Sequence, residues 1–246
     1  MNTLNFILGA SLQPGDFTGF TFFIGSVSMA AATFFFVMQH GRVNEKYKDS
    51  MLVAALITGI AAVHYYYMRD QWAEGLGSPT ELRYVDWILT VPLMVVEFAL
   101  LTGVGMTKLF WLSVVMLVTG YFGESGVTGV FDAQIWGAFS GLAYFAMAYE
   151  VGCLRVFSDT APSGAVGDAL ASAKGKIPSA GRMLQWFVLV GWSIYPLGYL
   201  LGTADGQWYA GIEPLLGGLP MDIVYNIGDA INKIGFGMAV WYAAKD

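Results

Sequence analysis

The sequence predicts an all-α fold, a bundle of seven transmembrane helices, from three observations. Hydrophobic residues make up 56% of the chain and charged residues only 12%, whereas about a quarter of the residues in a soluble domain are charged. Apolar stretches of about 20 residues, the length that crosses a bilayer as a helix, recur along the chain. Lysine and arginine gather in alternate connections between these stretches, as the positive-inside rule describes for membrane proteins.

We expect seven spans, joined by connections that leave no room for a soluble module. The spans cover residues 18–39, 50–68, 84–102, 107–122, 133–153, 183–202 and 219–244, of which the fourth is short. Residues 158–181 are rich in Ser, Ala and Gly, which is typical of a mobile loop. Residues 1–11 contain a brief apolar run without a basic leader, so no signal peptide is expected there. Residues 1–246 are interpreted as a single domain.

The distribution of basic residues predicts the orientation of the bundle in the membrane. One side carries Arg42, Lys46, Lys48, Lys108, Arg155, Lys174, Lys176, Arg182 and Lys245. The other side carries Arg69 and Arg83 among the acids Asp70, Glu74, Glu81, Glu124, Asp132, Asp205 and Glu213. Because cytoplasmic connections retain lysine and arginine, we expect the N-terminus outside and the C-terminus in the cytoplasm.

Charge and cysteine content exclude several classes of protein. The formal net charge is -6, and the sequence has no basic stripe of the kind that binds nucleic acid. The chain has one cysteine, Cys153, which rules out an internal disulfide and offers no metal-binding cluster. We interpret Cys153 as a small buried hydrophobic residue, so that stability must come from helix packing.

Five ionisable residues stand out in or at the mouth of two of the predicted spans. Asp86 and Glu97 belong to the third span, with Arg83 at its mouth, and Asp229 and Lys233 belong to the seventh. A charge at the centre of a bilayer costs about 2.5 to 3.5 kcal/mol, so such residues usually have a function. Asp229 and Lys233 are four residues apart, and taken alone they fit a structural ion pair equally well. Five groups together favour a functional site.

The spacing of these residues is that of a proton relay. Asp86 and Glu97 are separated by about three helical turns, which places both carboxyl groups on one face, about 16 Å apart along the axis. Arg83 lies one turn further out, and Lys233 lies near the middle of its span. A buried lysine forms a Schiff base with an aldehyde readily, and a neighbouring carboxylate balances its charge and accepts its proton.

The chain resembles the microbial rhodopsins, and within them the proteorhodopsin group of bacterial proton pumps. The resemblance extends over all seven spans. It rests on RYVDWILTVPLMVVEF from Arg83 to Phe98, WSIYP from Trp192 to Pro196, and YNIGDAINK from Tyr225 to Lys233, supported by HYYYMR from His64 to Arg69 and YFGESG from Tyr121 to Gly126.

The resemblance implies a light-driven outward proton pump, a transporter and not an enzyme. It implies that all-trans retinal is bound to Lys233 as a protonated Schiff base. Asp86 is then the main counter-ion and proton acceptor, Asp229 the second counter-ion, and Glu97 the proton donor, protonated at rest. Arg83 tunes the counter-ions. The side chains implied to line the polyene are Trp87, Thr90, Met94, Trp192, Tyr195 and Pro196.

Several finer expectations follow from the same resemblance. Met94 stands where related proteins tune their colour, and as an apolar residue it predicts green rather than blue absorption. A hydrogen bond from His64 to Asp86 is favoured over one to a neighbouring group, and it makes protonation of the acceptor sensitive to pH. Glu124 is either a proton-release group or, in the simpler interpretation, a solvated loop acid.

The expected partners are protons, the lipid bilayer and further copies of the chain. The resemblance implies a homo-oligomer, a pentamer or a similar ring, in the inner membrane of a bacterium. Phe23 stands where a tryptophan is expected to approach the histidine of the next subunit, which puts that contact in doubt. The sequence leaves open whether a carotenoid antenna is bound.

Other functions fit the residues less well. A sodium pump of this family is expected to carry Asn and Gln in place of Asp86 and Glu97, and a chloride pump lacks the acidic acceptor. The alternative that stays open is a photosensory rhodopsin with a slow photocycle, although Glu97 favours fast turnover. A transporter that uses the Lys233 and Asp229 pair without light is physically allowed.

Overall fold

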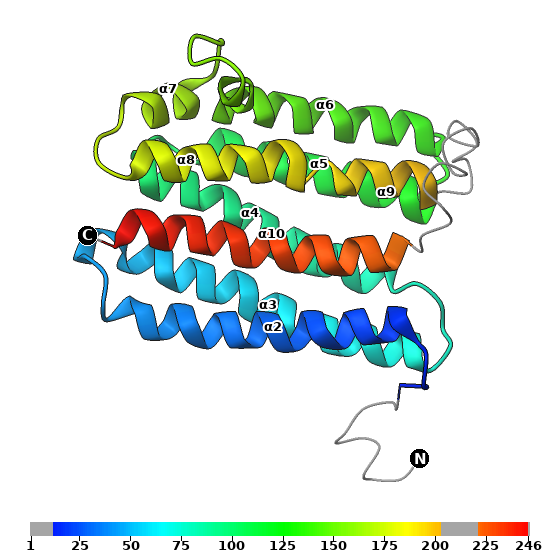
Figure 1. Ribbon diagram of the computed structural model, residues 1–246. Helices are drawn as coiled ribbons and strands as arrows, with labels where there is room; N and C mark the ends of the chain where they lie inside the picture. Colours follow the sequence, from blue (N-terminus) through cyan, green and yellow to red (C-terminus); the bar gives the residue numbers. More distant parts are fainter. Residues whose placement is uncertain (1–11, 203–220, 246) are drawn as a thin grey trace.

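The computed structural model describes residues 12–202 and 221–245 as a bundle of seven long helical rods that run up and down (Figure 1). The first five rods and the last are α2 (Phe17–His40), α3 (Lys48–Ala73), α4 (Thr80–Thr102), α5 (Thr107–Ser125), α6 (Ala133–Val151) and α10 (Met221–Ala244). The remaining rod consists of α8 (Ile177–Trp186), the π-helical turn η3 (Phe187–Gly191) and α9 (Ile194–Gly202). The all-α prediction is confirmed.

Shorter elements lie at one end of the bundle, together with the end of α10. They are the 3-10 turns η1 (Glu45–Tyr47) and η2 (Cys153–Val156) and the helix α7 (Ala165–Ser172) (Figure 1). We call this end the α7 end. The predictions for residues 1–11, for Asp205 and Glu213, and for a seventh span beginning at residue 219 fall partly or wholly outside the described residues.

Glycines explain where three of the helices stop. Gly103, Gly126 and Gly152 follow α4, α5 and α6 with φ angles of 74°, 63° and 76°. This left-handed conformation ends a helix and is unfavourable for residues with a Cβ atom. α5 ends three residues after the predicted fourth span, and α6 ends two residues before the end of the predicted fifth span.

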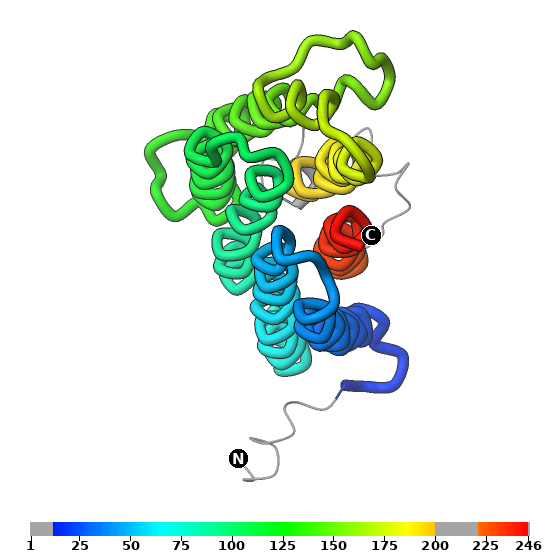
Figure 2. Tube along the Cα trace, turned by 90° about the vertical axis from the view of Figure 1, so that its left-hand side faces the viewer, coloured from blue at the N-terminus to red at the C-terminus, as the bar shows by residue number. Residues whose placement is uncertain are grey.

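The last helix closes one side of the bundle. Viewed along the bundle, α10 lies between α2 and α3 on one side and α8 and α9 on the other (Figure 2). It also contacts α4. A residue on the inner face of α10 is consequently shielded from the surroundings by several helices.

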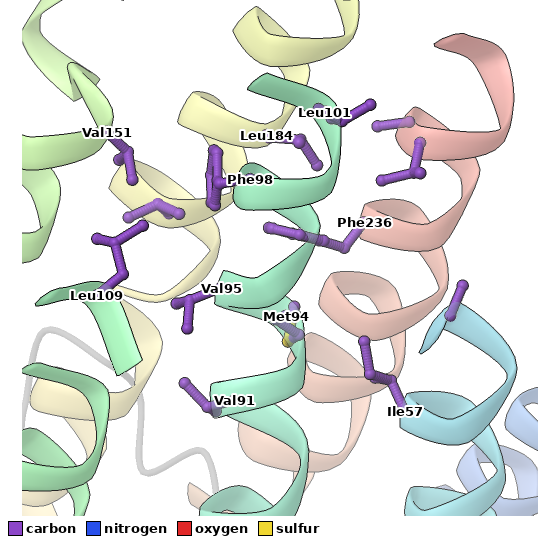
Figure 3. Close-up of a cluster of buried hydrophobic side chains, with 14 of the residues drawn as sticks. Ile57, Val91, Met94, Val95, Phe98, Leu101, Leu109, Val151, Leu184 and Phe236 are labelled. Atoms are coloured by element: carbon purple, nitrogen blue, oxygen red, sulfur yellow. The ribbon is translucent and has the colours of Figure 1, made fainter. Parts of the chain in front are cut away.

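Apolar side chains fill the half of the bundle nearest the α7 end. Phe98, Leu184 and Phe236 meet there from α4, α8 and α10 (Figure 3). The rings of Phe98 and Phe236 lie edge to face with their centroids 5.6 Å apart, a geometry that adds about 0.5 to 1.5 kcal/mol to packing. An apolar layer therefore separates the middle of the bundle from the α7 end.

The prediction of a mobile loop over residues 158–181 is wrong. The segment forms α7 and the first part of α8, and the side chains of Val166 and Leu170 are 1% and 2% exposed. Small residues permit this packing: a Cβ atom on Gly181 would lie 2.7 Å from Leu170. The composition that suggests flexibility reflects close contact between helices instead.

By length and composition alone, three of the described helices can cross a membrane, namely α2, α4 and the segment that combines η1 with α3. The sixth predicted span is divided by the η3 turn. The seventh carries the buried ionisable residues of the site, which lower its apolar character.

Candidate functional site

The centre of the bundle holds a lysine between two aspartates. Lys233 Nζ donates to Asp229 Oδ2 at 2.6 Å, one turn earlier on α10, and to Asp86 Oδ2 on α4. None of the three side chains is more than 1% exposed. The ion pair considered from the sequence is thus a triad of one amine and two carboxyl groups.

The Asp86 side chain, on α4, has few polar contacts besides Lys233. Thr90 Oγ1 donates to the Asp86 carbonyl at 2.8 Å, and the second carboxyl oxygen of Asp86 has no hydrogen-bond partner within the described part of the chain. Thr90 itself is fully buried. Asp86 therefore keeps one oxygen available to accept a proton.

Asp229 is fixed by aromatic residues. Tyr195 donates its hydroxyl to Asp229 Oδ1 at 2.8 Å, and the Tyr195 ring lies against Trp87, with centroids 4.8 Å apart. Tyr225 also packs against Trp87, with centroids 5.4 Å apart, and its ring stacks on that of Tyr195. A hydrogen bond from tyrosine to one oxygen and an ion pair at the other hold the Asp229 carboxyl group in place.

A cavity of about 590 Å³ opens beside the triad, between α4, α5, α6 and α9. Its volume lies within the range of about 300 to 1,000 Å³ that is usual for ligand sites. Trp87, Trp192, Tyr195 and Pro196, four of the residues expected to line the polyene, are among the residues that line it. The other lining residues are Tyr84, Val91, Met116, Leu117, Gly120, Gln134, Gly137, Ala138, Ser140, Gly141, Leu142, Tyr144, Phe145 and Tyr199.

The remaining residues predicted to surround the chromophore do not line this cavity. Thr90 and Met94 are buried on α4 outside the cavity lining, and Met94 belongs to the apolar cluster that also contains Ile57 (Figure 3). The walls are nearly all apolar, and Tyr195 links the cavity to Asp229 and so to Lys233. A long apolar aldehyde matches this combination of an apolar cavity with a nearby buried amine.

Arg83 does not contact the triad. Its guanidinium donates to Asp222 at 2.7 Å and to Asn226 at 3.4 Å, and it lies over the ring of Tyr225 at 4.8 Å. Sequence reasoning missed Asp222 and Asn226. The spacing could have revealed them, because positions 222, 226, 229 and 233 fall on one face of a helix.

Glu97 lies in the apolar layer near the α7 end. It is fully buried, and neither of its carboxyl oxygens has a hydrogen-bond partner among the residues described. The polar group that faces it is the hydroxyl of Ser50 on α3, outside ordinary hydrogen-bond geometry. Since an unpaired buried carboxylate is very costly, Glu97 is expected to carry a proton at rest, as the sequence also suggests.

The predicted hydrogen bond between His64 and Asp86 is absent from this part of the structure. His64 Nδ1 lies 2.9 Å from the carbonyl of Ile60 on its own helix, so that nitrogen is the donor in the neutral ring. The other ring nitrogen is then an acceptor, as is an ionised Asp86. Two acceptors cannot share a hydrogen bond, so the ring stays bonded to its own helix.

The structure corrects the loop interpretation of Glu124 and confirms the burial of Cys153. Glu124 is not a loop acid, because it lies in the last turn of α5 and accepts a hydrogen bond of 2.8 Å from the hydroxyl of Tyr84. Cys153 is 1% exposed, as expected for a small buried residue. Phe23, at the position expected to approach the next subunit, is 40% exposed on α2.

Fold and site together define a helical membrane protein with a buried lysine beside an apolar cavity. Residues 16–246 match the family described as bacteriorhodopsin-like protein. The chain belongs to this bacteriorhodopsin-like family of membrane proteins.

The relatives that resemble it include light-absorbing proteins. The chain is 37% identical over 243 residues to the green-light absorbing proteorhodopsin of Gamma-proteobacterium EBAC31A08, across 96% of this chain and 90% of that protein. It is also 37% identical to the blue-light absorbing proteorhodopsin of Gamma-proteobacterium Hot 75m4, across 96% and 89%. The crystal structure of blue light-absorbing proteorhodopsin from Med12 is 35% identical, covers 93% of this chain and 98% of its own, and has a TM-score of 0.73. These matches support the seven-helix fold directly.

Proposed function

We propose that this protein is a light-driven outward proton pump that binds retinal at Lys233. The observation that carries the proposal is the buried amine held between two carboxyl groups beside an apolar cavity. The proteorhodopsin relatives support it.

Retinal would be held by residues already in place. Lys233 would hold it covalently through its amine, with loss of water, and Trp87, Trp192 and Pro196 would present an apolar wall. Bound in the all-trans form as a protonated Schiff base, retinal would supply absorption of visible light and isomerisation. Asp86 and Asp229 would balance the positive charge on Lys233 Nζ.

The protein's own groups give proton movement a direction. Asp86, which has one carboxyl oxygen without a partner, accepts the proton of Lys233, whereas both oxygens of Asp229 already accept bonds from Tyr195 and Lys233. Arg83 lies beyond Asp86, next to Asp222, and its positive charge favours release of a proton on that side. Glu97 lies on the opposite side of Asp86, toward the α7 end.

We propose that the α7 end faces the cytoplasm. Basic residues gather there: Arg155 pairs with Asp168, Arg182 pairs with Asp159 at 2.5 Å, and Lys108 pairs with Glu150. The positive-inside rule then places the start of α2 outside. In this orientation a proton that moves from Glu97 toward Arg83 leaves the cell.

A direct test is to illuminate cells that make the protein and contain retinal, and to follow the pH of the medium. Reversible acidification that a protonophore abolishes is expected, and alkalinisation would overturn the direction. Flash absorption on the same preparation separates a pump from a sensor, because a photocycle of seconds or longer without acidification would favour the photosensory alternative. Failure to form a coloured pigment would favour a transporter that works without light.

Replacement of Glu97 with glutamine should slow return of the proton to Lys233 by about 100-fold, because an amide cannot act as the acid. Flash absorption measures this rate as the decay of the form in which the amine of Lys233 has lost its proton. Glu45→Gln, at an exposed position between α2 and α3, is the matched control and should decay as the parent does. Equally fast decay in both variants would show that Glu97 is not the donor.

The absorption maximum should lie in the green, and Met94→Gln should shift it to shorter wavelengths. Met94 is buried on α4, two turns from Asp86, and an amide dipole there would alter the field along the chromophore. A spectrum of each purified pigment measures the shift, with the exposed Met38→Gln as control. A parent pigment with a blue maximum would contradict the assignment.

Further parts of the proposal concern the assembly and location. We propose one domain over residues 1–246, spanning the inner membrane of a bacterium several times and assembled into a homo-oligomeric ring. His64 is proposed to tune the protonation of Asp86 when its own ring takes up a proton, because a positive charge there would favour the ionised carboxylate without a hydrogen bond between the two. An unchanged colour titration in His64→Asn would contradict that role.

A further inference from the structure

The rod formed by α8 and α9 widens into a π-helical turn beside the cavity. In η3 the amide of Trp192 donates to the carbonyl of Phe187 at 2.8 Å, five residues earlier. The amides of Ser193 and Tyr195 donate to residues only three positions earlier, at 3.2 and 3.1 Å. A regular α-helix would instead pair these three amides with residues four positions earlier.

The widened turn leaves three carbonyls for other donors, those of Val188, Leu189 and Gly191. A buried carbonyl in a membrane helix needs such a donor. Two neighbouring helices supply it. The hydroxyl of Tyr144, on α6, lies 2.9 Å from the Val188 carbonyl and 3.2 Å from that of Leu189. The side-chain amide of Asn232, on α10, donates to the Gly191 carbonyl at 2.9 Å.

The approach of Asn232 depends on the absence of a side chain at position 191. A Cβ atom on Gly191 would lie 2.1 Å from Asn232 Oδ1, well inside contact distance. Only glycine allows α10 to approach the turn this closely. The contact therefore depends on glycine at position 191 and on asparagine at position 232.

Asn232 also connects the turn to the buried triad. It directly precedes Lys233, and its amide nitrogen lies 3.4 Å from the hydroxyl of Tyr195, which bonds to Asp229. Trp192, in the cavity wall, directly follows the turn. Any displacement of the backbone at Lys233 therefore moves the side chain that holds the Gly191 carbonyl.

We propose that Asn232 and Tyr144 are positioning residues for the photocycle. They hold the η3 turn open at rest, and Asn232 releases the Gly191 carbonyl when α10 moves at Lys233, so that α8 can shift relative to α9. The inference rests on the proposed function for its light-driven step. The resting contact can be tested without that step.

The sequence permits each carbonyl to be observed alone. The dipeptide Gly–Trp occurs once, at residues 191 and 192, and Val–Leu occurs once, at 188 and 189. Holoprotein labelled with ¹³C at glycine carbonyls and ¹⁵N at tryptophan gives one coupled solid-state NMR signal, from Gly191. Labelling valine carbonyls and leucine nitrogens isolates Val188 in the same way.

In the dark, Asn232→Leu should shift the Gly191 signal to lower frequency, because the carbonyl loses its donor, and leave the Val188 signal in place. Tyr144→Phe should do the reverse. Tyr84→Phe removes a hydroxyl from the same cavity and serves as the matched control, with both signals unchanged. An unchanged Gly191 signal in Asn232→Leu would overturn the resting contact.

The light-driven part is tested in the unmodified protein, so it does not depend on a variant that folds. Freezing under illumination should move the Gly191 signal toward its position in Asn232→Leu. A signal that stays fixed, in a preparation that acidifies its medium in light, would overturn the release step. If the preparation does not pump although the dark signals behave as expected, the proposed function fails while the positioning roles stand. Asn232→Leu should also slow the decay of the deprotonated form several-fold.

Discussion

Replacement of Lys233 with alanine should abolish both the visible absorption band and light-driven proton transport. No other amine lies between the two buried aspartates in the described chain, so retinal would have no site for imine formation. Absorption spectra of purified protein mixed with retinal, and the pH of an illuminated cell suspension, measure the two losses.

The variant must be shown to fold, because it removes the partner of two buried acids. Leaving a buried charge unpaired costs about 3 to 5 kcal/mol, unless the acid takes up a proton. Circular dichroism in detergent would show whether the helices persist. Lys108→Ala is the matched control, because Lys108 is 62% exposed and pairs with Glu150 near the α7 end. A coloured Lys233→Ala protein would refute the assignment of this amine.

The second large effect is expected from Asp86→Asn, which should form a pigment but lower the initial transport rate by at least about 100-fold. Asparagine occupies the same volume but cannot accept the proton. The charge beside Lys233 also changes, since only Asp229 then balances the amine. We expect the absorption maximum to shift to the red and to stay constant on acidification, whereas that of the parent should shift to the red as Asp86 takes up a proton.

Asp132→Asn provides the comparison for this prediction, because Asp132 lies exposed before α6, away from the triad. It should leave both the colour and the transport rate unchanged. Transport by Asp86→Asn at a rate near that of the parent would mean that another group accepts the proton, and Asp229 would be the next candidate.

The central triad could be predicted because it depends on local geometry. Helical spacing alone puts Asp229 and Lys233 on one face, and the cost of a charge in a membrane singles out Asp86. The apolar cavity walls at Trp87 and Trp192 were predicted from the family motif. In each case a short stretch of sequence contains most of the information.

Other contacts depend on how distant segments meet, and the sequence does not reveal them. The partner of Arg83 is Asp222, and its identity depends on where the ends of α4 and α10 lie relative to each other. The η3 turn is stable only because Tyr144 and Asn232 reach its carbonyls from other helices. His64 was assigned the wrong partner because a carbonyl of its own helix competes for the ring nitrogen.

The charge of the triad limits which steps respond to membrane voltage. Passing a proton from Lys233 to Asp86 leaves the cluster at one net negative charge, and it moves that proton only across a direct contact. The path alongside α4 from Glu97 to Asp86 is about 16 Å long, roughly half of a hydrocarbon layer of about 30 Å. Moving one proton across the whole membrane against 100 mV costs about 2.3 kcal/mol, so moving it along this path costs roughly half of that. A membrane potential should therefore slow the transfer of a proton from Glu97 to Lys233 far more than the first transfer, from Lys233 to Asp86.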